Sequence, residues 1–234
     1  MDQELIRIQN VSKQYGRKLA LNNVNLVLYS GKIVGLLGPN GSGKTTLIKI
    51  LNGLIQNYQG NILINGYPVG KQSKSLISYL PDESYFHNWM RVKDGLALFR
   101  DMYEDFDEAR CRDLLQRFGL NEDNMAIKTM SKGMKEKFQL CLVMSRRAKI
   151  YILDEPIAGV DPAARDFIMD VILKNYDPQA LILLSTHLIS DLENVFDEII
   201  FLKEGVIVMH DQAENIRRNY DKSIDEVFRE VFRC

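Results

Sequence analysis

The run GPNGSGKT at residues 38–45 is the segment of this sequence with the clearest chemistry. It matches the pattern G-x-x-x-x-G-K-[ST], in which a glycine-rich loop wraps around the phosphates of a nucleotide. Gly41 and Gly43 let backbone N–H groups turn toward an anion. Lys44 can reach the β- and γ-phosphates, and the hydroxyl of Thr45 can bind Mg²⁺. The residues predicted to bind the nucleotide here are Gly38, Pro39, Asn40, Gly41, Ser42, Gly43, Lys44, Thr45 and Thr46.

A pair of carboxylates follows an apolar run further along the chain. Asp154 ends the run 150–153 and is predicted to hold Mg²⁺ through its water shell. Glu155 comes next, where a carboxylate can polarise the attacking water as a general base. His187 ends the next apolar run and could hydrogen-bond the γ-phosphate. The alternatives are a strand that ends in solvent and, for the histidine, a structural role.

One aromatic side chain could bind the base of the same nucleotide. Tyr15 lies in the polar segment 12–18, upstream of the phosphate loop, and its flat face could stack on adenine. A single tyrosine on a loop is usually an ordinary surface residue or a packing anchor. Spacing alone leaves both interpretations open.

The elements around these residues are the ones that the chemistry requires. The apolar run 32–37 predicts a buried strand before the phosphate loop, and 46–51 predicts a helix whose N-terminus adds partial positive charge. Further strands are predicted within 5–37 and at 60–67, 77–80, 149–156 and 180–187, with a hairpin at 198–209. Residues from about 84 to 146 have helical spacing and predict an inserted helical subdomain, and a charged helical tail is predicted at about 211–234.

The predicted fold is therefore α/β and occupies a single domain over residues 1–234. It consists of a P-loop NTPase core with a mixed sheet, an N-terminal antiparallel β subdomain and an inserted α-helical subdomain. Tyr85, Phe86, Trp89 and Met90 gather at the start of the helical region. Such a cluster most often belongs to the core, and a groove for a partner is the alternative.

The composition is that of an ordinary globular protein, with 46% hydrophobic and 26% charged residues among 234. A formal net charge of -1 gives no basic field that would favour nucleic acid as a partner. Cys111, Cys141 and Cys234 lack metal-ligand spacing and predict reduced thiols in a cytosolic protein. We expect no signal peptide, and no apolar run approaches the roughly 20 residues that span a bilayer. Any membrane role is expected to come through a partner.

Five short stretches, in the right order, resemble the ATP-binding cassette, which is the motor subunit of ABC transporters. They are the phosphate loop, the signature-like Ser131-Lys132-Gly133-Met134, the Walker B-like Leu153-Asp154-Glu155-Pro156, the D-loop-like Ala158-Gly159-Val160-Asp161, and His187 as the switch histidine. Tyr15 falls where the family places its adenine-stacking aromatic residue. The resemblance covers roughly residues 4–210.

The sequence departs from the family pattern at two places. The signature usually reads L-S-G-G-Q, whereas this chain has Met130 before the S-K-G-M run. The S-K-G-M form resembles a bacterial branch that exports drugs and small amphipathic peptides. Asp82 stands where the family has a glutamine, and a shorter aspartate can still contact Mg²⁺ or its waters.

The resemblance implies ATP and Mg²⁺ as cofactors and two cassettes that sandwich two ATP molecules. Each ATP would lie between the phosphate loop of one cassette and Ser131, Gly133 and Asp161 of the other. The implied Mg²⁺ ligands are Thr45, Asp82 and Asp154, and the implied catalytic residues are Glu155 and His187.

The partners that the resemblance implies are a second cassette, identical or paralogous, and integral membrane permease subunits at the cytoplasmic face of the cell membrane. The expected function is ATP hydrolysis that powers export of a drug or an antimicrobial-like peptide. One alternative is a nucleotide-binding module with little or no hydrolysis. Another is an ABC-type ATPase of ribosomes or DNA, although those usually carry two cassettes in one chain.

Overall fold

The computed structural model describes residues 3–158, 160 and 162–232. Ten strands form two sheets among these residues. The first sheet has the order β2-β1-β4-β5 and is antiparallel, with β1 at Glu4–Tyr15, β2 at Lys18–Tyr29, β4 at Gln59–Ile64 and β5 at Tyr67–Pro68. The second has the order β10-β9-β3-β8-β7-β6, with β3 at Ile33–Leu37, β6 at Ile77–Leu80, β7 at Ile150–Asp154, β8 at Leu181–Thr186, β9 at Glu198–Lys203 and β10 at Val206–Gln212.

The six-stranded sheet is mixed because only its last pair of strands runs antiparallel. Strands β3, β6, β7, β8 and β9 are parallel, and β10 returns against β9 through a tight hairpin. Glu204 and Gly205, which both have positive φ, form this turn. The carboxyl ends of β3, β6, β7 and β8 therefore lie at one edge of the sheet, where the polar residues that follow them gather.

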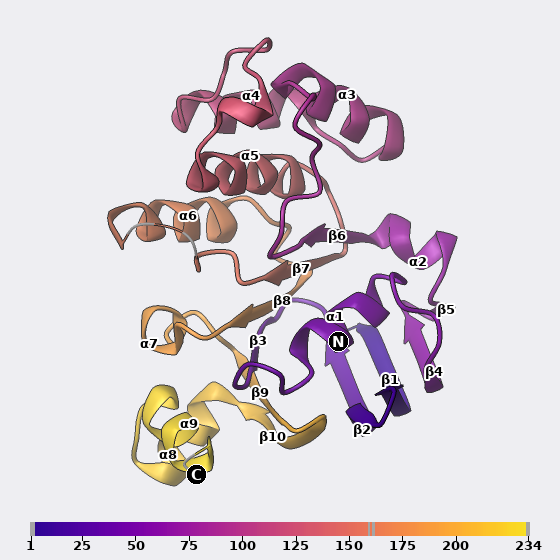
Figure 1. Cartoon of the computed structure of the whole chain (residues 1–234). Coiled ribbons are helices and arrows are strands. Elements are labelled where there is room, and N and C mark those ends of the chain that lie inside the picture. The colour runs from indigo at the N-terminus through magenta and orange to yellow at the C-terminus, as the bar shows by residue number, and fades with distance from the viewer. Residues whose placement is uncertain (1–2, 159, 161, 233–234) are drawn as a thin grey trace.

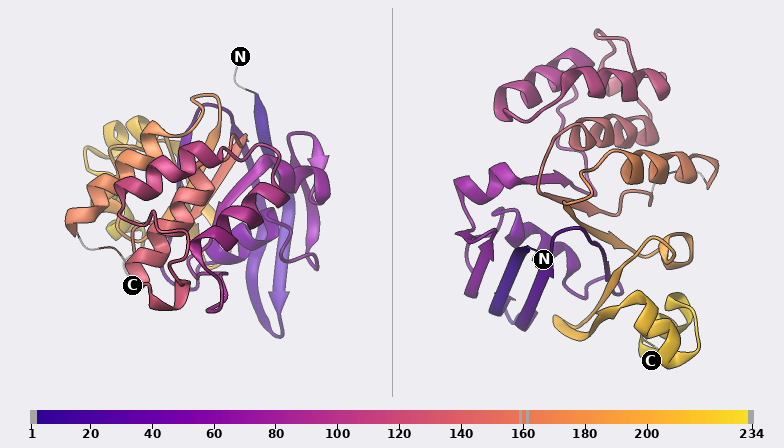
Figure 2. Two further views of the ribbon diagram at one scale, coloured as in Figure 1. Left: turned by 90° about the horizontal axis from the view of Figure 1, so that it is seen from above. Right: turned by 180° about the vertical axis from the view of Figure 1, so that it is seen from behind.

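The helices are grouped at three places (Figure 1). They are α1 at Lys44–Leu51, α2 at Lys71–Leu76, α3 at Val92–Met102, α4 at Glu108–Arg117, the 3₁₀ helix η1 at Ile127–Thr129, α5 at Lys132–Met144, α6 at Pro162–Lys174, α7 at Ile189–Leu192, α8 at Ala213–Tyr220 and α9 at Ile224–Phe232. Helices α3, α4 and α5 lie on one side of the central sheet, α8 and α9 lie at its far end, and α1 lies beside the antiparallel sheet (Figure 2).

Strands β3, β7 and β8 of the central sheet are buried on both faces, and alternate residues of β3 enter two different cores. Val34 and Leu36 of β3 pack with residues of α1 and the antiparallel sheet. Ile33 and Leu37 of the same strand pack in the core that also contains residues of the helical layers. This two-sided burial explains why the strands are continuous apolar runs in the sequence.

The architecture confirms the predicted fold class, and it corrects one local expectation. The segment 12–18 is not a polar loop, because β1 extends to Tyr15 and β2 begins at Lys18. The turn between them needs only two residues because Gly16 adopts a positive φ of 56°. Tyr15 therefore lies at a strand end, where the sheet restricts its backbone.

The C-terminal tail forms two helices instead of one stretch. Asp221, in a left-handed conformation with φ 51°, ends α8 and turns the chain into α9. The predicted stripe of α9 covers the sheet, since Val227 is fully buried and the rings of Phe228 and Phe232 contact that of Phe201. These contacts fix the tail against β9.

The aromatic cluster before α3 divides into core and surface residues. Phe86 and Met90 are 8% and 7% exposed, whereas Tyr85 is 41% and Trp89 is 73% exposed. The Phe86 ring packs 5.1 Å from the ring of Phe138 on α5, centroid to centroid. The core interpretation therefore holds for two of the four residues.

Candidate functional site

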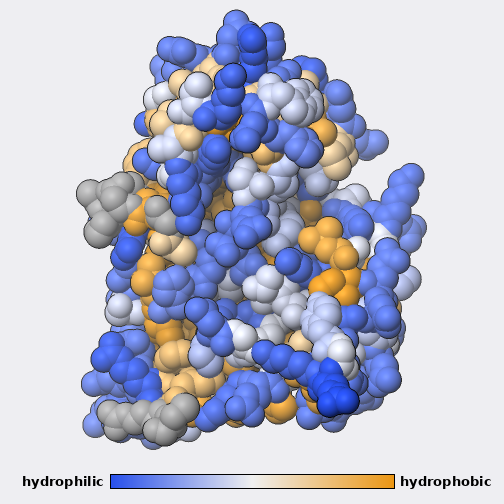
Figure 3. Space-filling model, in the orientation of Figure 1, coloured by the Kyte–Doolittle hydropathy of each residue, from blue (hydrophilic) through white to orange (hydrophobic). Residues whose placement is uncertain are grey.

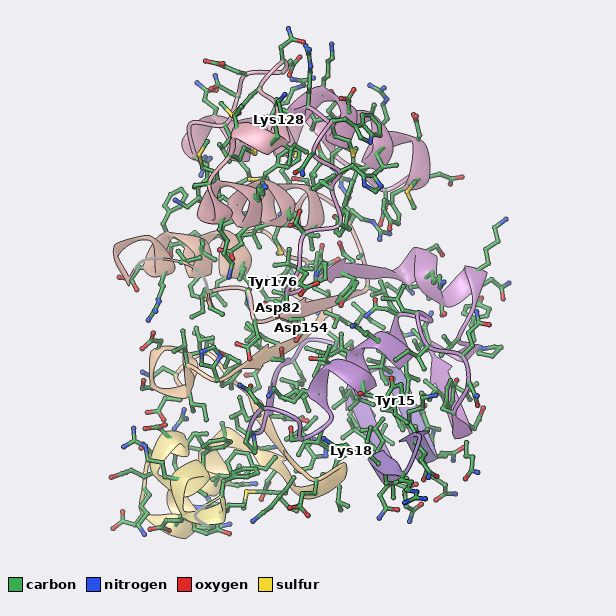
Figure 4. The ribbon with its side chains drawn as sticks, viewed as in Figure 1. Tyr15, Lys18, Asp82, Lys128, Asp154 and Tyr176 are labelled. Carbon is green, nitrogen blue, oxygen red and sulfur yellow. The ribbon has the colours of Figure 1, made fainter. Side chains whose placement is uncertain are left out.

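The residues predicted to bind nucleotide and metal meet around one cavity of about 270 Å³. Six of them come from the phosphate loop and its helix, and two carboxylates come from β7 and the residue after it. Figure 4 shows Tyr15 and Lys18 on the β1–β2 side of this region, with Asp82 and Asp154 on the opposite side. The lining residues are Tyr15, Lys18, Ala20, Asn40, Gly41, Gly43, Lys44, Thr45, Thr46, Asp82, Asp154 and Glu155.

Close backbone contacts determine the shape of the phosphate loop. A Cβ on Gly38 would lie 2.3 Å from the carbonyl oxygen of Leu202, and one on Gly43 would lie 2.5 Å from that of Ala20. Gly43 also has a φ of 112° at the N-cap of α1, so no other residue fits there without strain. Glycine at these two positions lets the loop pack against β2 and β9.

Lys44 is a buried cation at the base of the loop. Its Nζ donates to the carbonyl oxygen of Gly38 at 2.6 Å, and it is only 7% exposed. Burial lowers the pKa of Lys44, and the carboxylates of Glu155 and Asp154 oppose that shift. A phosphate group at this position would add the strong negative partner that a buried ammonium group requires.

Asp154 is a buried carboxylate with one unused oxygen. Its Oδ1 accepts a hydrogen bond from the hydroxyl of Ser185, the residue opposite it on β8. Its Oδ2 is buried and has no hydrogen-bond partner among the residues that the structure describes. Burial raises the pKa of Asp154, the Ser185 bond opposes the shift, and the nearby Asp82 and Glu155 carboxylates add to it.

These groups fit a hydrated Mg²⁺ that a nucleotide brings with it. Mg²⁺ keeps several waters and binds through one or two carboxylates together with phosphate oxygens. The orphaned Asp154 Oδ2, the Thr45 side chain and Asp82 supply such oxygens around the cavity. Within 3–158, 160 and 162–232, no group of three His, Cys, Asp or Glu residues could hold a metal alone, so the phosphates would be needed.

Glu155 is held in a strained backbone conformation beside His187. Its φ is 54°, which is unusual for a residue with a side chain, and its N–H donates to the carbonyl oxygen of Ser185 at 3.1 Å. Glu155 Oε2 lies 2.8 Å from His187 Nδ1 and accepts the His187 N–H at 3.3 Å. These contacts position a carboxylate at the cavity wall, where it can accept a proton from water.

The residues of the signature-like loop lie elsewhere and do not line the cavity. Ser131 is the N-cap of α5, and its Oγ accepts the N–H of Met134 at 3.2 Å. A Cβ on Gly133 would meet no atom of the described residues within 4 Å, so packing against them does not require a glycine there. Lys132 is exposed and pairs with Glu136 at 3.7 Å. Asp161 lies outside the described residues.

Gly38, Pro39, Ser42 and His187 do not line the cavity either. Gly38 and Pro39 supply carbonyl oxygens to Lys44, and Ser42 Oγ is buried without a partner in the described part of the chain. His187 reaches the cavity only through Glu155. The structure thus places these four residues behind or beside the lining residues.

The sequence analysis missed Lys18 and Ser185. Lys18 lines the cavity, and Ser185 holds both Asp154 Oδ1 and the backbone N–H of Glu155. Ser185 could have been found, since polar residues at the ends of neighbouring parallel strands meet at one edge. Lys18 could have been suspected because it is a cation only three residues after Tyr15, the candidate for stacking on adenine.

Comparison with known proteins places the chain in a family. The model of the ABC transporter family matches residues 21–158, which is more than half of the chain. The lantibiotic transport ATP-binding protein SrtF of Streptococcus pyogenes is 31% identical over 224 residues, covering 94% of this chain and 97% of SrtF.

Solved structures agree with the family match. A structure of the ATP-binding subunit of an ABC transporter superposes with a TM-score of 0.88 at 29% identity, covering 97% of this chain and 98% of that one. A dimeric ATP-binding cassette in a post-hydrolysis state, bound to ADP and Pi, shares the fold with a TM-score of 0.77 at 20% identity, covering 89% and 99%. This chain therefore belongs to the ABC transporter family as an ATP-binding cassette, and it is an ABC-type ATPase.

Proposed function

We propose that this chain is the ATP-hydrolysing subunit of a bacterial ABC exporter that moves a drug or an amphipathic, antimicrobial-like peptide through separate permease subunits. The observation that carries the proposal is that Lys44, Asp154 and Glu155 meet at one cavity beside the phosphate loop. The relative named for transport of lantibiotics, which are antimicrobial peptides, supports the substrate class.

In this proposal the residues that line the cavity bind different parts of ATP. Tyr15 stacks on the adenine, because this residue is 47% exposed and lines the cavity. The amides of residues 38–46 and the Lys44 ammonium bind the phosphates. Lys18 lines the same cavity and adds a second cation.

The carboxylates that line the cavity, Asp82, Asp154 and Glu155, carry out the chemistry of hydrolysis in this proposal. Thr45, Asp82 and Asp154 would hold Mg²⁺, which when bound offsets the negative charge of the phosphates. Glu155 accepts a proton from the attacking water. His187 orients the Glu155 carboxylate through the 2.8 Å contact of its Nδ1 and offers its ring to the γ-phosphate.

A second cassette completes each site in this proposal. The Ser131 Oγ accepts the Met134 N–H and keeps its own hydrogen free to donate to a γ-phosphate. The open space around Gly133 allows the partner's nucleotide to approach the N-terminus of α5. Asp161 is proposed at the same interface. Identical cassettes and paralogous cassettes would both supply these groups.

Asp82→Gln should retain at least about a tenth of the ATPase activity, because a glutamine oxygen can also contact a hydrated Mg²⁺. The measurement is the steady-state rate of phosphate release with saturating MgATP. Complete inactivity of a folded Asp82→Gln protein would show that the carboxylate charge is required.

Glu83 offers a matched control for this substitution. It is the next residue, yet it lines a different cavity that does not contain Asp82. Glu83→Gln should therefore leave the ATPase rate of the chain unchanged within about twofold.

We further propose that this second cavity, of about 510 Å³, receives a short helix of the permease. It lies between the C-terminal end of α1, the loop after β6 and the α3 region, and it is mostly apolar. Exposed apolar side chains surround it, with Leu54 59% and Met102 61% exposed. Figure 3 shows hydrophobic residues interrupting the polar surface in the region of α1 and α2. An amphipathic helix binds such a groove through residues spaced by three or four.

The loop after β6 connects the two cavities. Asp82 lines the nucleotide cavity, and Glu83, Ser84 and Tyr85 line the apolar one. A displacement at the nucleotide would therefore reach the permease contact within one or two residues. None of the described helices is long and apolar enough to cross a membrane, and we place the chain at the cytoplasmic face of the membrane through its permease.

Tyr85→Ala combined with Met102→Ala should weaken the permease complex by about 30-fold or more, since exposed aromatic anchors dominate helix-in-groove contacts. Co-purification of the permease from bacterial membranes measures the effect, and ATP binding by the isolated chain should persist. A Trp89→Ala variant tests the remaining exposed member of the cluster.

Phe86→Ala is the control, because this ring packs inside the chain. It should lower the free energy of unfolding by about 3 kcal/mol or more, so its defect would appear already in the isolated chain. If the exposed variants still assemble and support export, the docking site lies elsewhere. If the wild-type chain never co-purifies with a membrane subunit, the export function itself is contradicted.

A further inference from the structure

We propose that Lys13 is a positioning residue for nucleotide binding, which fixes the Tyr15 ring from the side opposite the base. The inference rests on the stacking of Tyr15 on adenine that is proposed above. It adds to that proposal a residue that lies outside the nucleotide cavity. This residue would hold the Tyr15 ring in place before ATP binds.

The Lys13 ammonium lies over the Tyr15 ring. The distance from Lys13 Nζ to the ring centroid is 4.8 Å, which is within the range of a cation–π interaction. The Lys13 residue is 8% exposed, whereas Tyr15 is 47% exposed. The cation is therefore buried against the ring while a large part of the ring remains accessible.

A backbone carbonyl holds the ammonium in this position. Lys13 Nζ donates to the carbonyl oxygen of Asn57, which lies in the segment between α1 and β4. Lysine is rarely buried unless it is paired, and here the partners are a carbonyl oxygen and an aromatic face. Lys13 thus connects the aromatic ring to the segment that follows the phosphate-loop helix.

The two residues face different cavities. Tyr15 lines the nucleotide cavity together with Lys18 and Gly41. Lys13 lines a separate cavity of about 130 Å³ with Asn57 and Tyr58. Figure 4 shows Tyr15 next to Lys18 on the nucleotide side. Lys13 can therefore act on the base only through the ring.

The strand itself is adapted at this point. The pairing of β1 with β2 shifts register on both sides of Lys13, between Val11 and Lys13 and again between Lys13 and Gln14. Such irregularities re-aim side chains and are common beside functional sites. These register shifts occur where the Lys13 ammonium lies over the ring of Tyr15, two residues further along the same strand.

Fixing the ring before binding removes an entropic cost. An exposed tyrosine that becomes ordered only when a base arrives loses side-chain freedom, which weakens binding. A ring already held by Lys13 avoids most of that loss, and its free face stays open for the base. Loss of Lys13 should therefore weaken the binding of ligands with an adenine and spare those without one.

The experiment compares ADP with pyrophosphate, which carries two phosphates and no base, by calorimetric titration in the presence of Mg²⁺. Lys13→Met keeps the length of the stem and removes the charge. It should weaken ADP binding about three- to tenfold and leave pyrophosphate binding unchanged within about twofold. Lys13→Arg keeps a cation that can lie over the ring and should restore most of the ADP affinity.

The matched control is Lys18→Met, which removes a lysine that lines the nucleotide cavity itself. Lys18→Met should weaken the binding of ADP and the binding of pyrophosphate to a similar degree. A double-mutant cycle completes the test: in a Tyr15→Leu background, Lys13→Met should cause no further loss of ADP affinity.

The inference is overturned if Lys13→Met weakens the binding of pyrophosphate as much as that of ADP. It is also overturned if Lys13→Met still weakens ADP binding in the Tyr15→Leu background. If Tyr15→Leu weakens ADP but Lys13→Met does not, Lys13 has no positioning role and the stacking proposal stands. If Tyr15→Leu itself leaves ADP affinity intact while Lys44→Ala lowers it, both the stacking proposal and the role of Lys13 are wrong.

Discussion

Lys44→Ala is expected to lower ATP turnover by at least about a hundredfold and to weaken nucleotide binding, because it removes a buried cation that forms charge-assisted bonds with phosphate. Lys44 is the cation beside Asp154 and Glu155, whose charges oppose the lowering of its pKa by burial. Without it, the two carboxylates would also repel the phosphates. The measurements are steady-state phosphate release and the dissociation constant for ATP.

Lys71→Ala is the matched control, since Lys71 is an exposed lysine at the start of α2 and does not line the cavity. Its ATPase rate should equal that of the wild type within about twofold. Unchanged turnover in purified, folded Lys44→Ala protein would reject the assignment of residues 38–46 as the phosphate-binding loop.

Glu155→Gln is expected to bind ATP with wild-type affinity while losing turnover by about a hundredfold or more, the usual contribution of a general base. Glutamine keeps the shape of the side chain and an oxygen that can accept the His187 N–H, which the Glu155 Oε2 accepts at 3.3 Å. It also removes one negative charge that would face the γ-phosphate. The nucleotide should then persist and hold two cassettes together.

Size-exclusion chromatography with and without MgATP measures this trapped dimer. Glu122→Gln, at an exposed position in the segment after α4, should stay active and show no such shift. A Glu155→Gln protein that remains monomeric with ATP at high concentration would contradict the sandwich of two cassettes. Full activity of the same variant would contradict the role of Glu155 as a general base.

The sequence by itself determined the phosphate-loop motif, the order of strands and helices, and the pair of carboxylates at the end of β7. These features are local, because a loop between a strand and a helix needs particular residues at fixed spacing. Buried parallel strands such as β7 and β8 are short apolar runs, which single-sequence patterns reveal. The family match and the fold confirm the predicted family and the predicted fold class.

Local patterns failed where a residue's environment depended on distant chain segments. The tail divides at Asp221 because its left-handed backbone ends α8, and no glycine or proline marks the break. Phe86 is buried and Trp89 is exposed, although they lie three residues apart, because the ring of Phe138 covers only the first. Local composition cannot predict which of two nearby aromatic residues packs against another side chain in the core.

Only the tertiary structure decided which groups support the site. Ser185 reaches Asp154 because β7 and β8 are neighbours in the sheet, in a register that sets these two residues opposite each other. Lys13 lies against Tyr15 because a carbonyl 44 residues further along the chain fixes its ammonium. Such contacts depend on strand order and register. The hydrophobic pattern of a strand determines which face of the sheet each residue occupies, but it does not determine which residue of a neighbouring strand lies opposite. Sequence spacing alone therefore does not predict these contacts.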